Sequence, residues 1–177
     1  TFTFQANLAD YGPAIGSDEG LREVFRAEIT ESVDTLRAAY DAGVPLLTGS
    51  ESGFSLTPYG DWHYRELQVF VEDLGMTPLQ AINSATEQGA RALKREGELG
   101  CIKPGYLADL LIFDGEPEKV ITQLGDQHRF RHIMKDGKLV DLTSPPPKNW
   151  ELPGWRVSEY SERVLTRQLV DSMGLAR

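Results

Sequence analysis

A long apolar stripe followed by a glycine and a short apolar run constrains the fold of this 177-residue chain most strongly. The spacing of three and four residues within this stripe predicts an amphipathic helix, which Gly43 is suited to end. Residues 44–48, VPLLT, are typical of a parallel strand buried on both faces. Together they indicate one step of an α/β barrel or of a doubly wound sheet. The stripe consists of Leu21, Phe25, Ile29, Val33, Leu36 and Tyr40.

Two further helices are predicted after this run. Asp61 can cap the first of them, whose apolar stripe includes His63 and ends at Gly75. The second starts at Thr77-Pro78, where a capping box combines with proline at the first helical position, and we expect it to extend to about Lys94. Helices therefore dominate the middle of the chain.

The pattern changes to β structure from Gly97 onward. Residues 107–113 predict a buried strand, and residues 131–134 and 138–142 predict a hairpin. Asp136-Gly137 between the hairpin strands strongly favours a tight turn.

The two ends of the chain carry weaker signals. Residues 1–6 alternate as a short strand would, and they begin like a sequence entered midway, so we expect a fragment. A complete eightfold β/α barrel needs roughly 250 residues, more than this chain holds. After the proline run 145–147, a tail helix capped by Ser158 is predicted, with one apolar face made of Leu165, Leu169 and Met173.

Composition excludes several classes of partner. A net charge of −9 and a pI near 4.8 argue against nucleic acid, whose phosphates need a basic surface. No apolar run approaches the ~20 residues of a membrane span. The single cysteine, Cys101, cannot form an internal disulfide, which fits a reducing, cytoplasmic setting, and we expect it to be a buried thiol.

Three ordered stretches carry a family resemblance. They are AGVPLLTGSESG at 42–53, LGMTPLQAINSATEQGA at 74–90 and GCIKPGYLADL at 100–110, followed by the hairpin. In this order and spacing they resemble the amidohydrolase superfamily, particularly its imidazolonepropionase-like and Xaa-Pro-dipeptidase-like branches.

This resemblance implies an α/β fold in three parts. Residues 1–96 would be the C-terminal segment of a distorted (β/α)8 barrel, and residues 97–143 part of a composite β-sandwich domain. Residues 144–177 would be a Pro-rich linker and a helical tail. The implied activity is hydrolysis of C–N bonds in amides, cyclic amides or dipeptides by water activated on a divalent metal, often zinc.

The resemblance assigns the chemistry to one residue, Glu51, which matches the family's Asp at the end of barrel strand eight. That Asp is both a metal ligand and the general base, and Glu51 keeps the carboxylate with one more methylene. Ser52, Gly53 and Phe54 follow in the loop where barrel enzymes build specificity, so we expect them to bind substrate. The aromatic rings of Phe54 and Tyr59 could either line an apolar pocket or pack against the small β domain.

The remaining metal ligands would lie outside this chain, so we expect the isolated chain to bind no metal tightly and to be inactive. An incomplete barrel leaves strand edges uncovered, which predicts a homo-oligomer or a complementing N-terminal segment. The alternative is a catalytically silent module with a role in assembly, for which Trp150 and Trp155 in the tail would be evidence.

Other polar residues have structural interpretations. His63 lies on a helix stripe, which favours a packed or capping histidine over a ligand. His128 and His132 lie in a loop and strand pattern, which favours the surface or hairpin packing. Asp109 is expected to be a hydrogen-bonding residue of the β domain.

Overall fold

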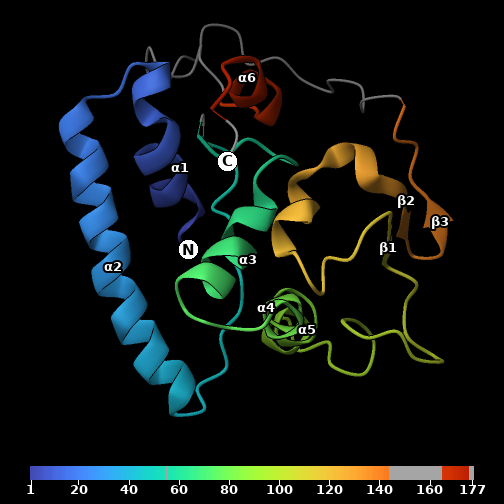
Figure 1. Ribbon diagram of the computed structural model, residues 1–177. Coiled ribbons are helices and arrows are strands. Elements are labelled where there is room, and N and C mark those ends of the chain that lie inside the picture. The colour runs from blue at the N-terminus through green and yellow to red at the C-terminus, as the bar shows by residue number, and fades with distance from the viewer. Residues whose placement is uncertain (55, 144–164, 176–177) are drawn as a thin grey trace, which may run out of the picture.

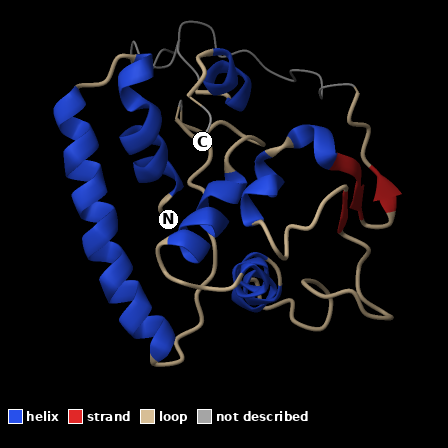
Figure 2. Cartoon of the chain, in the orientation of Figure 1, coloured by secondary structure: helices blue, strands red, loops and turns tan. Residues whose placement is uncertain are grey.

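The computed structural model describes residues 1–54, 56–143 and 165–175 (Figure 1). Helices occupy the N-terminal half and a small sheet lies apart from them on the other side (Figure 2). No helix in the described ranges has the length and apolar character that crossing a membrane requires. The elements are α1 (Thr3–Tyr11), η1 (Gly12–Ile15), α2 (Glu19–Asp41), α3 (His63–Glu72), α4 (Pro78–Ala85), α5 (Glu87–Ala92), β1 (Leu110–Phe113), η2 (Ile121–Gly125), η3 (Gln127–Arg129), β2 (Phe130–Lys135), β3 (Lys138–Leu139) and α6 (Arg167–Ser172).

The first predicted helix is confirmed as α2. The Asp18 side chain caps it by accepting a hydrogen bond from the Gly20 amide at 2.6 Å. Gly43 follows the helix with a φ of +84°, a left-handed conformation that favours glycine. Val33 of the predicted stripe is buried.

The predicted strand at residues 1–6 is wrong, because this segment enters helix α1. The amides of Phe2 and Thr3 donate to Glu66 Oε2 of α3, at 2.6 and 3.0 Å. The buried Glu66 carboxylate therefore satisfies amides at the helix start that no side chain of α1 caps. No strand in the described part of the chain lies alongside residues 1–6 to pair with them.

The predicted buried strand at 44–48 is also absent. Val44 and Leu47 are 48% and 53% exposed, and residues 44–48 join no sheet among the described residues. A parallel strand forms only where neighbouring strands supply its hydrogen bonds, and the described chain offers none beside this segment.

The helices after residue 60 differ from prediction in two places. Asp61 does not cap α3, because its carboxylate accepts from Gln127 and from the Arg167 amide instead. The capping box of α4 is confirmed, with Thr77 and Gln80 exchanging hydrogen bonds. The helix expected to reach Lys94 breaks at Thr86 into α4 and α5, where the Thr86 hydroxyl donates to the Ile82 carbonyl at 2.8 Å.

The strands form an antiparallel sheet in the order β1-β2-β3. The hairpin prediction is confirmed, since Asp136 and Gly137 both have positive φ, at 50° and 74°, as a type I′ turn requires. Asp109 accepts from Lys135 Nζ at 2.5 Å and from the Asp136 amide at 2.7 Å, which confirms its structural role. β1 itself is not a buried strand, because Leu111 is exposed on a sheet of only three described strands.

Two clusters of buried side chains form the core. The Phe70 cluster joins α3 and α4 to α2 and the start of the chain, and consists of Phe2, Ala6, Val33, Leu67, Val69, Phe70, Leu74, Met76, Ala81 and Ile121. The Trp62 cluster joins α1 and the start of α3 to the C-terminal segment, and consists of Leu8, Tyr11, Ile15, Leu56, Trp62, Tyr64, Leu165 and Val170.

The described part of the tail contains the short helix α6. The proline run, Trp150, Trp155 and Ser158 lie outside the described residues. In the described part, Thr166 caps α6 by accepting from the Leu169 amide at 3.1 Å.

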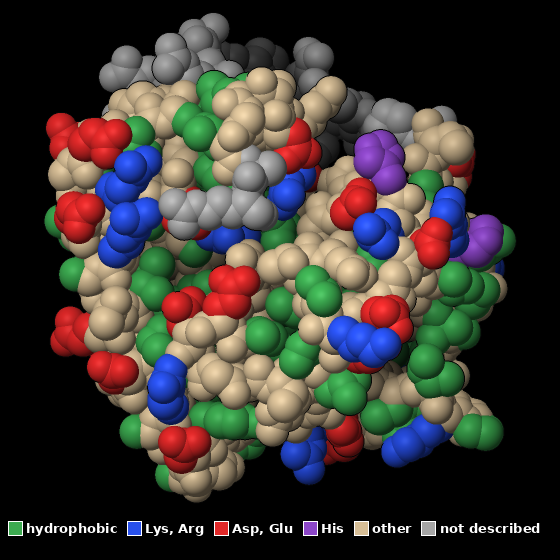
Figure 3. Space-filling view, in the orientation of Figure 1, with side chains coloured by type: hydrophobic (Ala, Val, Ile, Leu, Met, Phe, Trp, Pro, Cys, Tyr) green, Lys and Arg blue, Asp and Glu red, His purple; other side chains and the backbone are tan. Residues whose placement is uncertain are grey.

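The surface carries scattered apolar side chains. Acidic and basic groups are interspersed on the face in Figure 3, with apolar side chains grouped toward the sheet. The most exposed of the large apolar residues include Leu93, Ile102, Leu111 and Leu139. These side chains are available for contacts outside the described residues, in line with the predicted association, which stays a prediction.

Candidate active-site loop

The loop 49–60 joins the segment 44–48 to helix α3 and carries the predicted site residues. Glu51 is exposed at its start and has a φ of +49°, in the left-handed region that a non-glycine residue adopts only at a cost. Its carbonyl accepts from Thr57 Oγ1 at 2.9 Å, while its carboxylate has no partner among the described residues. The Glu51 side chain is thus exposed to solvent.

Internal hydrogen bonds make this loop a compact turn. The Gly53 amide donates to the Thr57 carbonyl at 2.9 Å, and the Thr57 amide donates to the Phe54 carbonyl at 3.0 Å. The buried Leu56 anchors the loop in the Trp62 cluster, and its carbonyl accepts from Asn7 Nδ2 of α1 at 2.8 Å. These contacts connect the residues that follow Glu51 to each other and to helix α1.

His63 joins this loop, so the packed alternative of the packed-or-capping prediction is wrong. It is exposed in the first turn of α3, with Nδ1 2.9 Å from Ser50 Oγ. The Gly60 amide donates to Nε2 at 3.3 Å, so the ring proton resides on Nδ1 and is donated to Ser50. Ser50 Oγ lies 2.7 Å from Ser52 Oγ, so a chain of polar contacts flanks Glu51 on both sides.

The predicted substrate-binding residues are only partly brought together. Ser52 joins the hydrogen-bonded chain with His63, and Gly53 has a φ of +123° that suits glycine. Phe54 packs edge-on against Phe4 of α1, with ring centroids 5.9 Å apart, rather than on the small β domain. Tyr59 is largely exposed.

A divalent metal does not fit the described residues by themselves. They contain no group of three or more His, Cys, Asp or Glu side chains that could hold an ion. A zinc site needs three or four ligands, and the loop supplies the carboxylate of Glu51 alone. His128 and His132 are exposed, as predicted for surface residues, and Cys101 is only half-buried where a buried thiol was expected.

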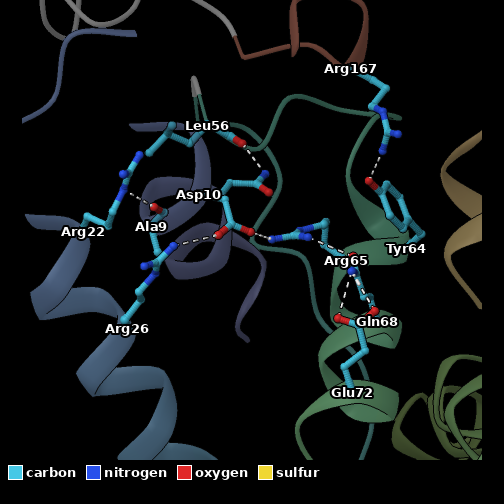
Figure 4. A network of polar contacts seen from close by, with 11 residues as sticks. Ala9, Asp10, Arg22, Arg26, Leu56, Tyr64, Arg65, Gln68, Glu72 and Arg167 are labelled. Carbon is cyan, nitrogen blue, oxygen red and sulfur yellow. Dashed lines mark hydrogen bonds and ion pairs between the residues drawn. The ribbon is translucent and has the colours of Figure 1, made fainter. Parts of the chain in front are cut away.

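A partly buried polar network among helices α1, α2 and α3 was not predicted from the sequence. Asp10 of α1 lies between Arg26 of α2 and Arg65 of α3, and links the three helices (Figure 4). Burial raises the pKa of Glu66 despite the amides that hydrogen-bond to it. Burial also raises the pKa of Tyr64, although Arg167 beside it acts in the opposite sense. Nothing in the local sequence reveals these contacts, because the partners are far apart along the chain.

A model of the amidohydrolase family matches residues 22–140, which include Glu51, the loop and the hairpin. This chain belongs to the amidohydrolase family. The family assignment agrees with the resemblance seen in the three sequence stretches.

Named amidohydrolase relatives extend well beyond this chain. It is 32% identical to an ochratoxinase of Aspergillus niger over 126 residues, covering 68% of this chain and 25% of the relative. It is 40% identical to an imidazolonepropionase of Nocardia farcinica over 108 residues, covering 61% of this chain and 27% of the relative. The chain thus spans about a quarter of the length of these relatives.

Solved amidohydrolase structures share the arrangement of the elements. A Xaa-Pro dipeptidase with bound methionine in its active site aligns with a TM-score of 0.60 and 29% identity, covering 78% of this chain and 33% of that chain. The architecture is therefore consistent with an α/β fold of the amidohydrolase type.

Proposed function

We propose that the complete protein hydrolyses C–N bonds in amides, cyclic amides or dipeptides, and that this chain supplies the acidic residue of its site. The observation that carries the proposal is the family match over residues 22–140, with Glu51 exposed and unpaired among the described residues at the position of the family's acid. The chain would form the C-terminal segment of a barrel and part of a β-sandwich.

Glu51 would act as the general base and then as the general acid. Its carboxylate takes a proton from the attacking water as the water oxygen bonds to the carbonyl carbon. It then delivers that proton to the leaving nitrogen as the C–N bond breaks, which balances the hydrolysis. The exposure of the Glu51 carboxylate, and its lack of a partner among the described residues, support this role.

The neighbouring residues would orient the substrate. Ser52 offers a hydroxyl next to Glu51, and the Tyr59 hydroxyl lies beside Gly53. The exposed face of the Phe54 ring would contact an apolar part of the substrate.

We keep a divalent metal, zinc by expectation, in the proposal for the complete protein only. Glu51 would be one ligand and the others would come from outside this chain, since the described residues hold no group of three. The bound ion would polarise the scissile carbonyl. A cytoplasmic location, and association with a second copy or a complementing N-terminal segment, are part of the same proposal.

A catalytically silent module is the second candidate. One observation favours it, namely a glutamate where the family has an aspartate. A base displaced by about 1 Å can lose ~100-fold in rate, so the extra methylene of Glu51 bears on activity.

Turnover and metal content of the complete protein decide between the two. We expect Glu51→Gln to lower kcat by about 100-fold or more on dipeptide or cyclic amide substrates, since it keeps the shape and removes the base. Glu96→Gln, at an exposed glutamate in the turn after α5, is the control and should leave kcat unchanged. Full turnover in Glu51→Gln would refute the role of Glu51, whereas a purified complete protein with neither turnover nor bound divalent metal would favour the silent module.

A further inference from the structure

The C-terminal segment, residues 165–175, lies beyond the family match at 22–140 but packs beside the active-site loop (Figure 1). Leu165 and Val170 are both 0% exposed and belong to the Trp62 cluster. Leu56 of the loop belongs to the same cluster. The segment and the loop thus share one core.

Directed polar contacts add to this packing. The indole Nε1 of Trp62 donates to the Leu165 carbonyl at 2.6 Å, and the Arg167 amide donates to Asp61 Oδ2 at 2.9 Å. The Arg167 guanidinium lies over the ring of Tyr64, 5.6 Å from its centroid, and donates to its hydroxyl. The segment therefore holds the residues on both sides of His63.

We call the contacts between the C-terminal segment and residues 61–64 the junction. Asp61 also connects a third part of the chain, around η3, to it. Its second carboxylate oxygen accepts from Gln127 Nε2 at 2.6 Å, next to the sheet. One half-buried side chain thus receives hydrogen bonds from both the C-terminal segment and the region around η3.

These contacts reach the site through His63, which binds Ser50 and the Gly60 amide at the two ends of the loop. We propose that the C-terminal segment is a positioning element, which sets the place of Glu51 by fixing residues 61–64 and Leu56. Its residues act through the loop and do not touch the substrate. The inference rests on the proposed function only for its effect on turnover.

Amide hydrogen exchange on the full 177-residue chain tests this without any substrate. Leu165→Ala should accelerate exchange of the Gly53 and Thr57 amides by about thirtyfold, because it removes buried packing beneath the loop. The Ala81 amide, at the start of α4, should exchange at the wild-type rate. A segment that only stabilised the whole chain would accelerate all of these amides equally.

Leu74→Ala is the matched control, because Leu74 is a buried leucine of the Phe70 cluster, which includes no residue of the C-terminal segment. It should accelerate the Ala81 amide more than the loop amides. The same pattern of exchange in Leu165→Ala and Leu74→Ala would overturn the inference.

A second variant reports on the junction without removing buried packing. In a Trp150→Phe/Trp155→Phe background Trp62 is the single tryptophan, so its fluorescence reports on this junction. Arg167→Ala should increase its quenching by acrylamide and accelerate loop exchange, and Arg167→Lys should restore part of both. Unchanged quenching and unchanged loop exchange in Arg167→Ala would contradict the inference. A complete protein without turnover would refute the proposed function and leave these results as they are.

Discussion

Removal of the Asp10 carboxylate should destabilise the chain, because it leaves a buried arginine without its ionic partner. Arg65 is 6% exposed, and its Nη2 lies 2.5 Å from Asp10 Oδ2. Arg26 approaches the other oxygen of Asp10 at 3.8 Å. In Asp10→Ala, Gln68 remains as an acceptor for Arg65 at 2.9 Å, so one hydrogen bond survives while the countercharge is lost.

The magnitude follows from the burial of the pair. Breaking a buried ion pair by removing one partner costs about 3–5 kcal/mol. The Asp10 side chain is 20% exposed and Gln68 remains bound to Arg65, so the low end applies, about 3 kcal/mol. An unfolding entropy of about 2.1 cal/mol/K per residue converts this into a fall in Tm of about 8 °C for a chain of this length.

Thermal unfolding at neutral pH, followed by circular dichroism or calorimetry, measures this shift. Asp34→Ala is the control, because Asp34 is an exposed acid on α2, and it should change Tm by less than about 1 °C. The double variant Asp10→Ala/Arg65→Met should recover most of the loss, since no buried charge remains. The reasoning is refuted if Asp10→Ala melts within the error of Asp34→Ala.

Three further predictions concern Glu66, Thr77 and Asp109. Burial raises the pKa of Glu66 above its ordinary value of 4.5, so the folded chain binds more protons than the unfolded chain just above that pH. The free energy of unfolding should therefore fall as pH rises through this window, and Glu66→Gln should flatten the dependence in denaturant titrations between about pH 4 and 7. Thr77→Ala should cost about 1 kcal/mol, or about 3 °C in Tm, whereas Thr77→Ser keeps the cap and should cost much less. The hydrogen bonds from Lys135 and the Asp136 amide lower the pKa of Asp109, so its contribution to the turn is lost as pH falls. Asp109→Ala should accelerate exchange of the Asp136 amide and leave the α4 amides unchanged; equal rates at Asp136 would contradict the assignment.

Elements whose hydrogen bonds close within a few residues could be predicted from the sequence. The capping box of Thr77 and Gln80 and the Asp136-Gly137 turn formed as expected, since their donors and acceptors lie within three residues of each other. Helix α2 was predicted by the spacing of three and four residues between its apolar side chains. The three ordered stretches indicated the family, and the position of Glu51 in an exposed loop followed from them.

The site around Glu51 was predictable only in part. Glu51 and Ser52 lie in the predicted loop, but the strand expected before them is absent among the described residues. The bond between Ser50 and His63 joins residues with no spacing pattern in common. His63 occupies a stripe position, but it lies in the first turn of α3, where its ring turns to the loop instead of the core.

Contacts between residues far apart along the chain determined the conformation of segments whose local sequence pattern was misleading. Residues 1–6 alternate like a strand, yet they enter a helix because the buried Glu66, more than sixty residues away, accepts from their amides. Residues 44–48 have the composition of a buried strand and remain unpaired, because no described strand lies beside them. The sequence by itself thus determined helix α2, the start of α4, the Asp136-Gly137 turn and the family. The tertiary structure alone decided the environment of Glu51, since side chains distant along the chain, from Asn7 to Leu165, meet around its loop.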